Sequence, residues 1–74
     1  MFYIVGNKRC MNVRTARIEA YRIVKKTKKG IDIYKATAQG TADAGNVIMR
    51  GDKVYYTPYQ GRTYVLYADG SVQY

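Results

Sequence analysis

The 74-residue sequence contains no histidine, one cysteine and only five acidic residues. A single cysteine, Cys10, cannot form an internal disulfide, and without histidine neither a Cys/His zinc finger nor a Cys/His catalytic pair is available. We therefore expect Cys10 to be a small buried hydrophobic residue. The stability of the fold then has to come from apolar burial, well-formed turns or self-association.

The five acidic residues fall on separate segments, as Glu19, Asp32, Asp43, Asp52 and Asp69. Two of them, Asp52 and Asp69, stand beside glycine in turn sequences, where aspartate often accepts hydrogen bonds from nearby backbone. The sequence pairs no two carboxylates as general acid and general base, and it shows no metal-ligand spacing. We expect no enzyme activity, no metal and no cofactor.

Long apolar runs are also missing, so we expect no membrane-spanning segment. The apolar start Met1–Val5 is ended by Gly6–Arg9 after only five residues, which is too short for a secretory signal. We expect a single small domain over residues 1–74, located in the cytoplasm. Its length is close to the size at which a hydrophobic core is only just sufficient.

Positive charge and tyrosine are abundant. Thirteen Lys and Arg stand against the five acids, which gives a net charge of +8, and nine residues are tyrosine. A field of this sign attracts nucleic acid, an anionic membrane surface or an acidic protein partner. Tyrosine favours sheets and can lie at a surface with its hydroxyl in water.

The C-terminal stretch 47–74 predicts a four-stranded antiparallel meander. Turn signals separate short runs of sheet-favouring residues, and Asp-Gly is among the strongest of these signals because type I′ turns need positive φ. The predicted strands are Val47–Arg50, Lys53–Pro58, Arg62–Tyr67 and Ser71–Tyr74.

Two-residue loops at all three turns would divide the meander into two faces, because side chains alternate along a strand. The predicted core takes one face, together with Ile4 and Ile33 from the first half of the chain: Val47, Met49, Val54, Tyr56, Val65, Tyr67 and Val72. A three-residue turn with a G1 bulge at Tyr59–Gly61 is the alternative. It would slip the register by one residue and exchange the faces locally.

The first half of the chain is less regular. Met1–Val5 predicts a short buried strand that ends at a Gly6-Asn7 turn. From Ile18 to Ala38 the pattern favours a hairpin, since residues 31–38 alternate clearly after a Gly-containing turn. A helix over about residues 12–26, capped by Asn12, is the alternative. The small polar segment Gln39–Asn46 predicts a flexible link.

The fold class expected from these patterns is mostly β. A small antiparallel sheet should curl into a partly open barrel, because two partly apolar faces in so short a chain need mutual cover. If the helix over residues 12–26 forms, the class is α+β instead.

The second face of the meander interleaves tyrosines with cations, which is typical of sheets that bind single-stranded nucleic acid without sequence preference. Aromatic rings would stack on bases and cations would contact phosphates. The turn lysines would add phosphate contacts, although they equally fit a solvated turn. The predicted nucleic-acid-binding residues are Arg50, Lys53, Tyr55, Tyr59, Arg62, Tyr64, Lys28 and Lys29.

A protein-interaction module is the alternative function, since tyrosine and arginine are also enriched where proteins bind each other. It would be an adaptor, an inhibitor or an assembly subunit of the kind that phages and mobile elements encode. Its partner would be an acidic protein, or a second copy pairing through the edge left by the last strand.

Overall fold

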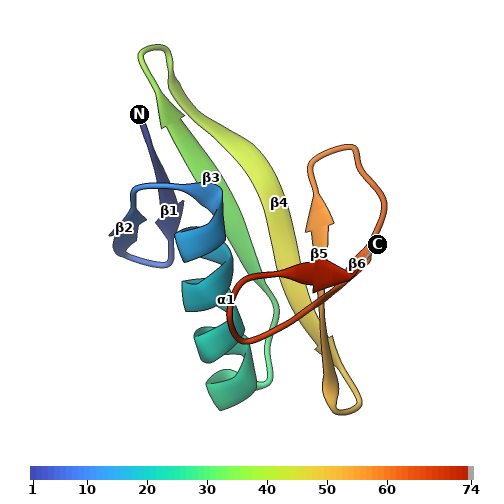
Figure 1. The fold of residues 1–74 in the computed structure, drawn as a ribbon. Coiled ribbons are helices and arrows are strands. Elements are labelled where there is room, and N and C mark those ends of the chain that lie inside the picture. Colours follow the sequence, from blue (N-terminus) through green and yellow to red (C-terminus); the bar gives the residue numbers. More distant parts are fainter. Residues whose placement is uncertain (74) are drawn as a thin grey trace.

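The computed structural model describes residues 1–73, which form one helix and one antiparallel sheet (Figure 1). The strand order across the sheet is β2-β1-β3-β4-β5-β6-β7, and the sheet is not closed into a barrel. The elements are β1 (Phe2–Val5), β2 (Lys8–Cys10), α1 (Val13–Thr27), β3 (Ile31–Thr37), β4 (Gly40–Arg50), β5 (Lys53–Pro58), β6 (Tyr64–Leu66) and β7 (Val72–Gln73). The predicted four-stranded meander is confirmed as β4 to β7; Tyr74, the predicted end of its last strand, lies outside the described residues.

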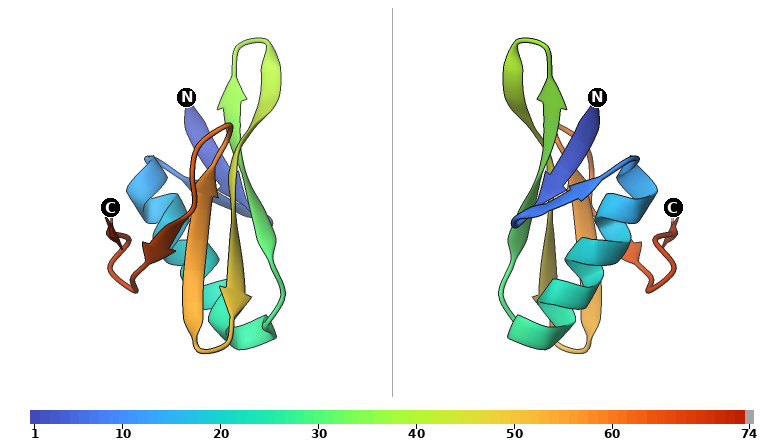
Figure 2. Two further views of the ribbon diagram at one scale, coloured as in Figure 1. Left: turned by 90° about the vertical axis from the view of Figure 1, so that its right-hand side faces the viewer. Right: turned by 90° about the vertical axis from the view of Figure 1, so that its left-hand side faces the viewer.

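The sheet curls around the helix. Figure 2 shows α1 on one side of the sheet, with β6 and the C-terminal turn curving towards that same side. Strands take up about half of the residues. The mostly-β fold class is therefore confirmed, and the alternative with one helix near residues 12–26 fits as well.

The hairpin predicted from Ile18 to Ala38 is wrong in its first half, because residues 13–27 form α1. Asn12 caps the helix by accepting a hydrogen bond from the Thr15 amide at 2.8 Å. The buried residues Ala16, Ala20 and Val24 recur every four positions, which is the spacing of one helix face. These local signals outweigh the strand-like alternation of the same stretch. Only β3 keeps the predicted extended structure.

The predicted flexible link Gln39–Asn46 is also wrong, since β4 begins at Gly40 and pairs with β3 through this stretch. One of its small residues, Gly45, serves close strand packing. Gly45 has φ +136, and a Cβ added to it would lie 2.6 Å from the Thr57 carbonyl oxygen on β5. No side chain fits there, so the glycine is required for β5 to approach β4.

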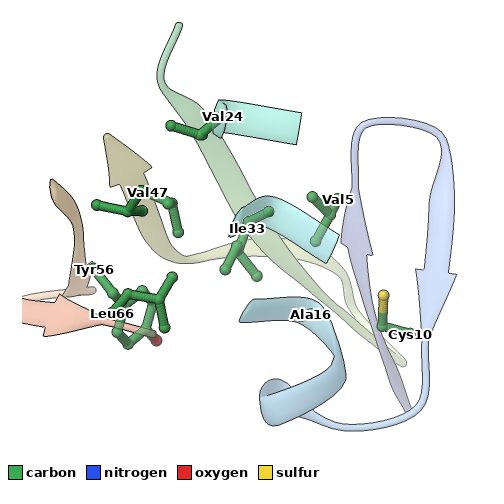
Figure 3. Close-up of a cluster of buried hydrophobic side chains, with 10 residues drawn as sticks. Val5, Cys10, Ala16, Val24, Ile33, Val47, Tyr56 and Leu66 are labelled. Carbon is green, nitrogen blue, oxygen red and sulfur yellow. The ribbon is translucent and has the colours of Figure 1, made fainter. Parts of the chain in front are cut away.

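The core lies between α1 and the helix-facing side of the sheet (Figure 3). The small side chains of Ala16 and Ala20 let the helix come close to the strands. Cys10 is 1% exposed, which confirms its role as a buried hydrophobic residue. The sheet residues buried in this core are Val5, Cys10, Ile33, Val47, Val54, Tyr56 and Leu66.

Three predicted core residues lie elsewhere. Val65 and Ile4 are on the face opposite the helix, and Tyr67 is 45% exposed. For Val65 and Tyr67 the cause is a one-residue slip after β5, since Tyr56 pairs with Tyr64 instead of Val65. Ile4 alternates with the buried Val5 along β1 and so faces away from the helix. The other predicted core residues are confirmed. Val47, Val54, Tyr56 and Ile33 are buried, while Met49 and Val72 pack at the core's margin.

The slip originates in the connection between β5 and β6. The Gly61 amide donates to the Pro58 carbonyl at 2.9 Å, and Gln60 takes a left-handed φ of 58°. This turn is longer than the two-residue loop that the predicted register required. The following turn compensates, because Leu66 pairs with Val72 and so returns Val72 to the helix-facing side.

Candidate nucleic-acid interface

The face of the sheet opposite α1 is not covered by any other described element (Figure 2). Cross-strand pairing aligns Ile48, Tyr55 and Val65 in one half-buried row on this uncovered face. Arg50 and Lys53 form the next cross-strand pair, beside the turn between β4 and β5. An apolar row with an aromatic ring at its centre therefore ends at two cations.

Helix α1 ends beside the same turn. Its last turn carries Lys25 and Lys26, where cations interact favourably with the negative end of the helix dipole. Lys28 terminates the helix in a left-handed conformation, and its amide donates to the Val24 carbonyl at 2.8 Å. A Cβ added to Gly30 would lie 3.0 Å from Cγ2 of Ile48. The loop after the helix therefore passes directly against β4.

These two segments create a cluster that we call the basic end. Figures 1 and 2 show the C-terminal end of α1 and the β4–β5 turn side by side at the lower end of the molecule. Asp52, in that turn, is the acid closest to them in sequence. The basic end consists of Lys25, Lys26, Lys28, Lys29, Arg50 and Lys53, all exposed.

The charge of the basic end is not neutralised by ion pairs within residues 1–73. Elsewhere the acids are engaged: Glu19 lies 2.9 Å from Arg22 and 3.7 Å from Lys8, and Asp69 lies 3.8 Å from Arg14. The pKa of Asp69 is lowered, chiefly by hydrogen bonds from the Ser71 side chain and amide. Uncompensated positive charge is thus concentrated at one end of the molecule.

Tyr55 adjoins the basic end on the uncovered face. The guanidinium carbon of Arg50 lies over its ring, 6.0 Å from the ring centroid. This is the outer limit of an effective cation–π contact. An aromatic surface and a planar cation are therefore held together where the cationic cluster meets the sheet.

The structure brings five of the eight predicted site residues to this end: Lys28, Lys29, Arg50, Lys53 and Tyr55.

The other three are set apart. Tyr59, 61% exposed, and Arg62 lie in the β5–β6 connection at the opposite end of β5. Tyr64 pairs with Tyr56 on the helix-facing side, because of the one-residue slip. The single face of three tyrosines and three cations is therefore wrong.

A second part of the uncovered face carries negative charge. The Tyr34 hydroxyl donates to Asp32 at 3.3 Å, and Asp43 lies opposite Tyr34 on β4. Both carboxylates raise the Tyr34 pKa, Asp32 most strongly. The alternation of residues 31–38 already places Asp32 and Tyr34 on one face. The position of Asp43 was missed because it falls in the segment predicted as a link.

No charged side chain is buried in the described part of the chain. Burial raises the pKa of the Cys10 thiol, and the nearby Glu19 raises it further. Burial also raises the pKa of Tyr56, against the opposing effect of the Arg17 charge. Within residues 1–73, no group of three or more Cys, Asp or Glu side chains is placed to hold a metal ion.

Comparison with protein-family models, curated proteins and solved structures gives no match. No helix in the described part of the chain has the length and apolar character needed to cross a membrane.

Proposed function

We propose that this chain is a binding module, not an enzyme, and that it binds single-stranded nucleic acid at the basic end. Phosphates contact the cations, and an unpaired base contacts Tyr55. The observation that carries the proposal is the convergence of two cationic segments, residues 25–29 and 50–53, beside an aromatic ring on an uncovered sheet face. Single-strand binders combine positive charge that contacts the phosphates with aromatic rings on which bases stack.

The cations supply a binding energy that depends on salt. Each phosphate neutralised on a single strand contributes roughly −0.7 to the slope of log K against log salt concentration. If four of the six cations contact phosphates at once, the slope is about −3. Stacking adds about 1–3 kcal/mol per base and releases no counterions, so it leaves the slope unchanged.

A single strand fits this surface better than a duplex does. Tyr55 is half-buried in the row with Ile48 and Val65, so only a base that has left its stack can reach the ring face. A duplex would contact only the cations, through its phosphates, and would not stack on Tyr55. We expect tighter binding of an unpaired oligonucleotide than of the corresponding duplex at equal salt.

The test is fluorescence anisotropy with a labelled oligonucleotide across a salt series. Two variants remove two charges each from the basic end, K28Q/K29Q and R50Q/K53Q. Each should weaken binding and reduce the magnitude of the slope by up to about 1.4. The matched control R9Q/R62Q removes two exposed cations that form no ion pair within residues 1–73, one on β2 and one in the β5–β6 connection, and it should leave the slope unchanged.

Two results would contradict the proposal. If the control pair reduces binding as much as the basic-end pairs do, only net charge matters. If the wild type binds no oligonucleotide at low salt, a protein-interaction module takes its place. The observation that favours this second candidate is the uncovered face around Ile4 and Tyr34, the latter 40% exposed.

A further inference from the structure

The position of Arg50 affects how a base can reach Tyr55. Its guanidinium carbon is 6.0 Å from the ring centroid, over the ring face. A base that stacks on this face must therefore either displace Arg50 or enter beneath it. Which of the two happens depends on the spacing and on the freedom of the Arg50 side chain.

The spacing favours entry. Stacked bases follow one another at about 3.4 Å, so a base between two planar groups separates them by about 7 Å. The guanidinium carbon lies 6.0 Å from the ring centroid, about 1 Å less than that separation. Arg50 is exposed and forms no ion pair within residues 1–73, so its side chain can move to make room for a base. Guanidinium groups stack on bases as aromatic rings do.

We propose that Arg50 and Tyr55 form a clamp that holds one unpaired nucleobase between them. The inference rests on the proposed function and gives Arg50 a different role from the other cations, because it contacts a base instead of a phosphate. The clamp has no requirement for base identity, since every base presents a π face.

The surroundings of Tyr55 fit a site for one base. Ile48 and Val65 flank the ring in the same row and offer apolar contact to the base edges. Farther along the uncovered face lie Asp32 and Asp43, whose carboxylates repel phosphates. The strand therefore leaves the clamp towards the basic end and does not continue across the sheet.

The chain contains a matched control for the clamp. Arg62 is an exposed arginine in the β5–β6 connection, away from the basic end. The ring contact with Tyr55 is made by Arg50. The same charge-conserving substitution at these two positions therefore separates stacking from charge, because R50K removes the planar group at the ring whereas R62K removes one elsewhere.

The experiment compares two ligands of equal length, an oligothymidylate of eight nucleotides and a fully abasic strand. R50K should lower the affinity for oligothymidylate about 5- to 10-fold, with the salt slope and abasic binding unchanged. Y55L should lower it similarly or more, whereas the control R62K should stay within about 2-fold of the wild type. Because the clamp needs both residues, R50K/Y55L should lose less than the product of the two single losses.

Three other results would contradict the clamp, and the comparison of the two ligands distinguishes them. If the wild type binds neither strand, the proposed function fails and the clamp fails with it. If the wild type binds both strands equally, the basic end binds phosphates but no base enters. If Y55L weakens binding while R50K equals the wild type, Tyr55 stacks alone. Equal melting temperatures of all variants ensure that these comparisons concern folded protein.

Discussion

Two neighbouring residues of β6 test the register of the sheet directly. Leu66 is 2% exposed in the core, whereas Val65 lies half-buried on the uncovered face. Truncation of Leu66 to alanine removes three buried carbons, worth about 2.4 kcal/mol of transfer free energy, and the cavity raises the cost to about 3–4 kcal/mol. Truncation of Val65 removes two partly exposed carbons and should cost roughly 1 kcal/mol.

The measurement is urea denaturation of both variants beside the wild type, followed by fluorescence or circular dichroism. A chain of this size has a free energy of unfolding of roughly 4–11 kcal/mol, so Leu66→Ala should move the midpoint far and Val65→Ala only slightly. Equal m-values would show that both variants unfold from the same compact state. If Val65→Ala costs as much as Leu66→Ala, the one-residue slip after β5 is wrong.

Two further predictions concern a strand contact and an acid. Gly45→Ala should destabilise the fold by several kcal/mol or prevent folding, because the new Cβ would lie 2.6 Å from the Thr57 carbonyl at a φ of +136; unchanged thermal unfolding would refute this. Asp69 has a lowered pKa in the folded chain, so it contributes stability above its unfolded pKa and loses it as pH falls through the folded value. Ser71→Ala should move the Asp69 pKa upwards in an NMR titration, because both the hydroxyl bond and the local turn are weakened; an unmoved pKa would show that Ser71 does not set it.

The meander was predictable because its turns are encoded locally. Gly51 and Gly70 take positive φ values of 65° and 86°, which is what the turn signals in the sequence indicate. The predicted strand Lys53–Pro58 coincides with β5. The one-residue slip beyond it is the register of the three-residue alternative at Tyr59–Gly61. A count of loop residues could not decide between the two registers, since it does not show that Gln60 adopts a left-handed conformation.

The helix was harder to predict because part of its stabilisation comes from residues far away in the sequence. Arg17 interrupts the apolar stripe of α1, but it donates to the Gly70 carbonyl at 2.8 Å. Arg14 donates to the Asp69 carbonyl at 3.0 Å in the same turn. A Cβ on Gly70 would lie 2.9 Å from the Arg14 carbonyl oxygen, so the turn packs closely against the helix. These contacts are not visible in a local pattern.

Part of the candidate site was predictable because it lies next to a turn that the sequence encodes locally. The two-residue turn between β4 and β5 fixed the placement of Arg50, Lys53 and Tyr55 on one face. Tyr64 left that face because of the slip after β5. Turn signals in the sequence thus predict which face a side chain takes when it lies next to a two-residue turn. They do not predict the face of a side chain that follows a longer turn.

The basic end itself follows from topology. The chain enters β3 where α1 ends, and β4 runs antiparallel to β3, so β4 must finish where β3 begins. The turn to β5 therefore lies beside the end of the helix, whatever residues it contains. Lysines are stabilised at a helix C-terminus by the dipole, and cations near a short turn also discourage strand pairing between molecules. The lysines of the helix end and the cations of the turn thus each have a structural reason of their own, yet the topology brings both groups together beside Tyr55. Binding measurements on K28Q/K29Q and R50Q/K53Q can show whether the two groups bind the same ligand together or only one of them does.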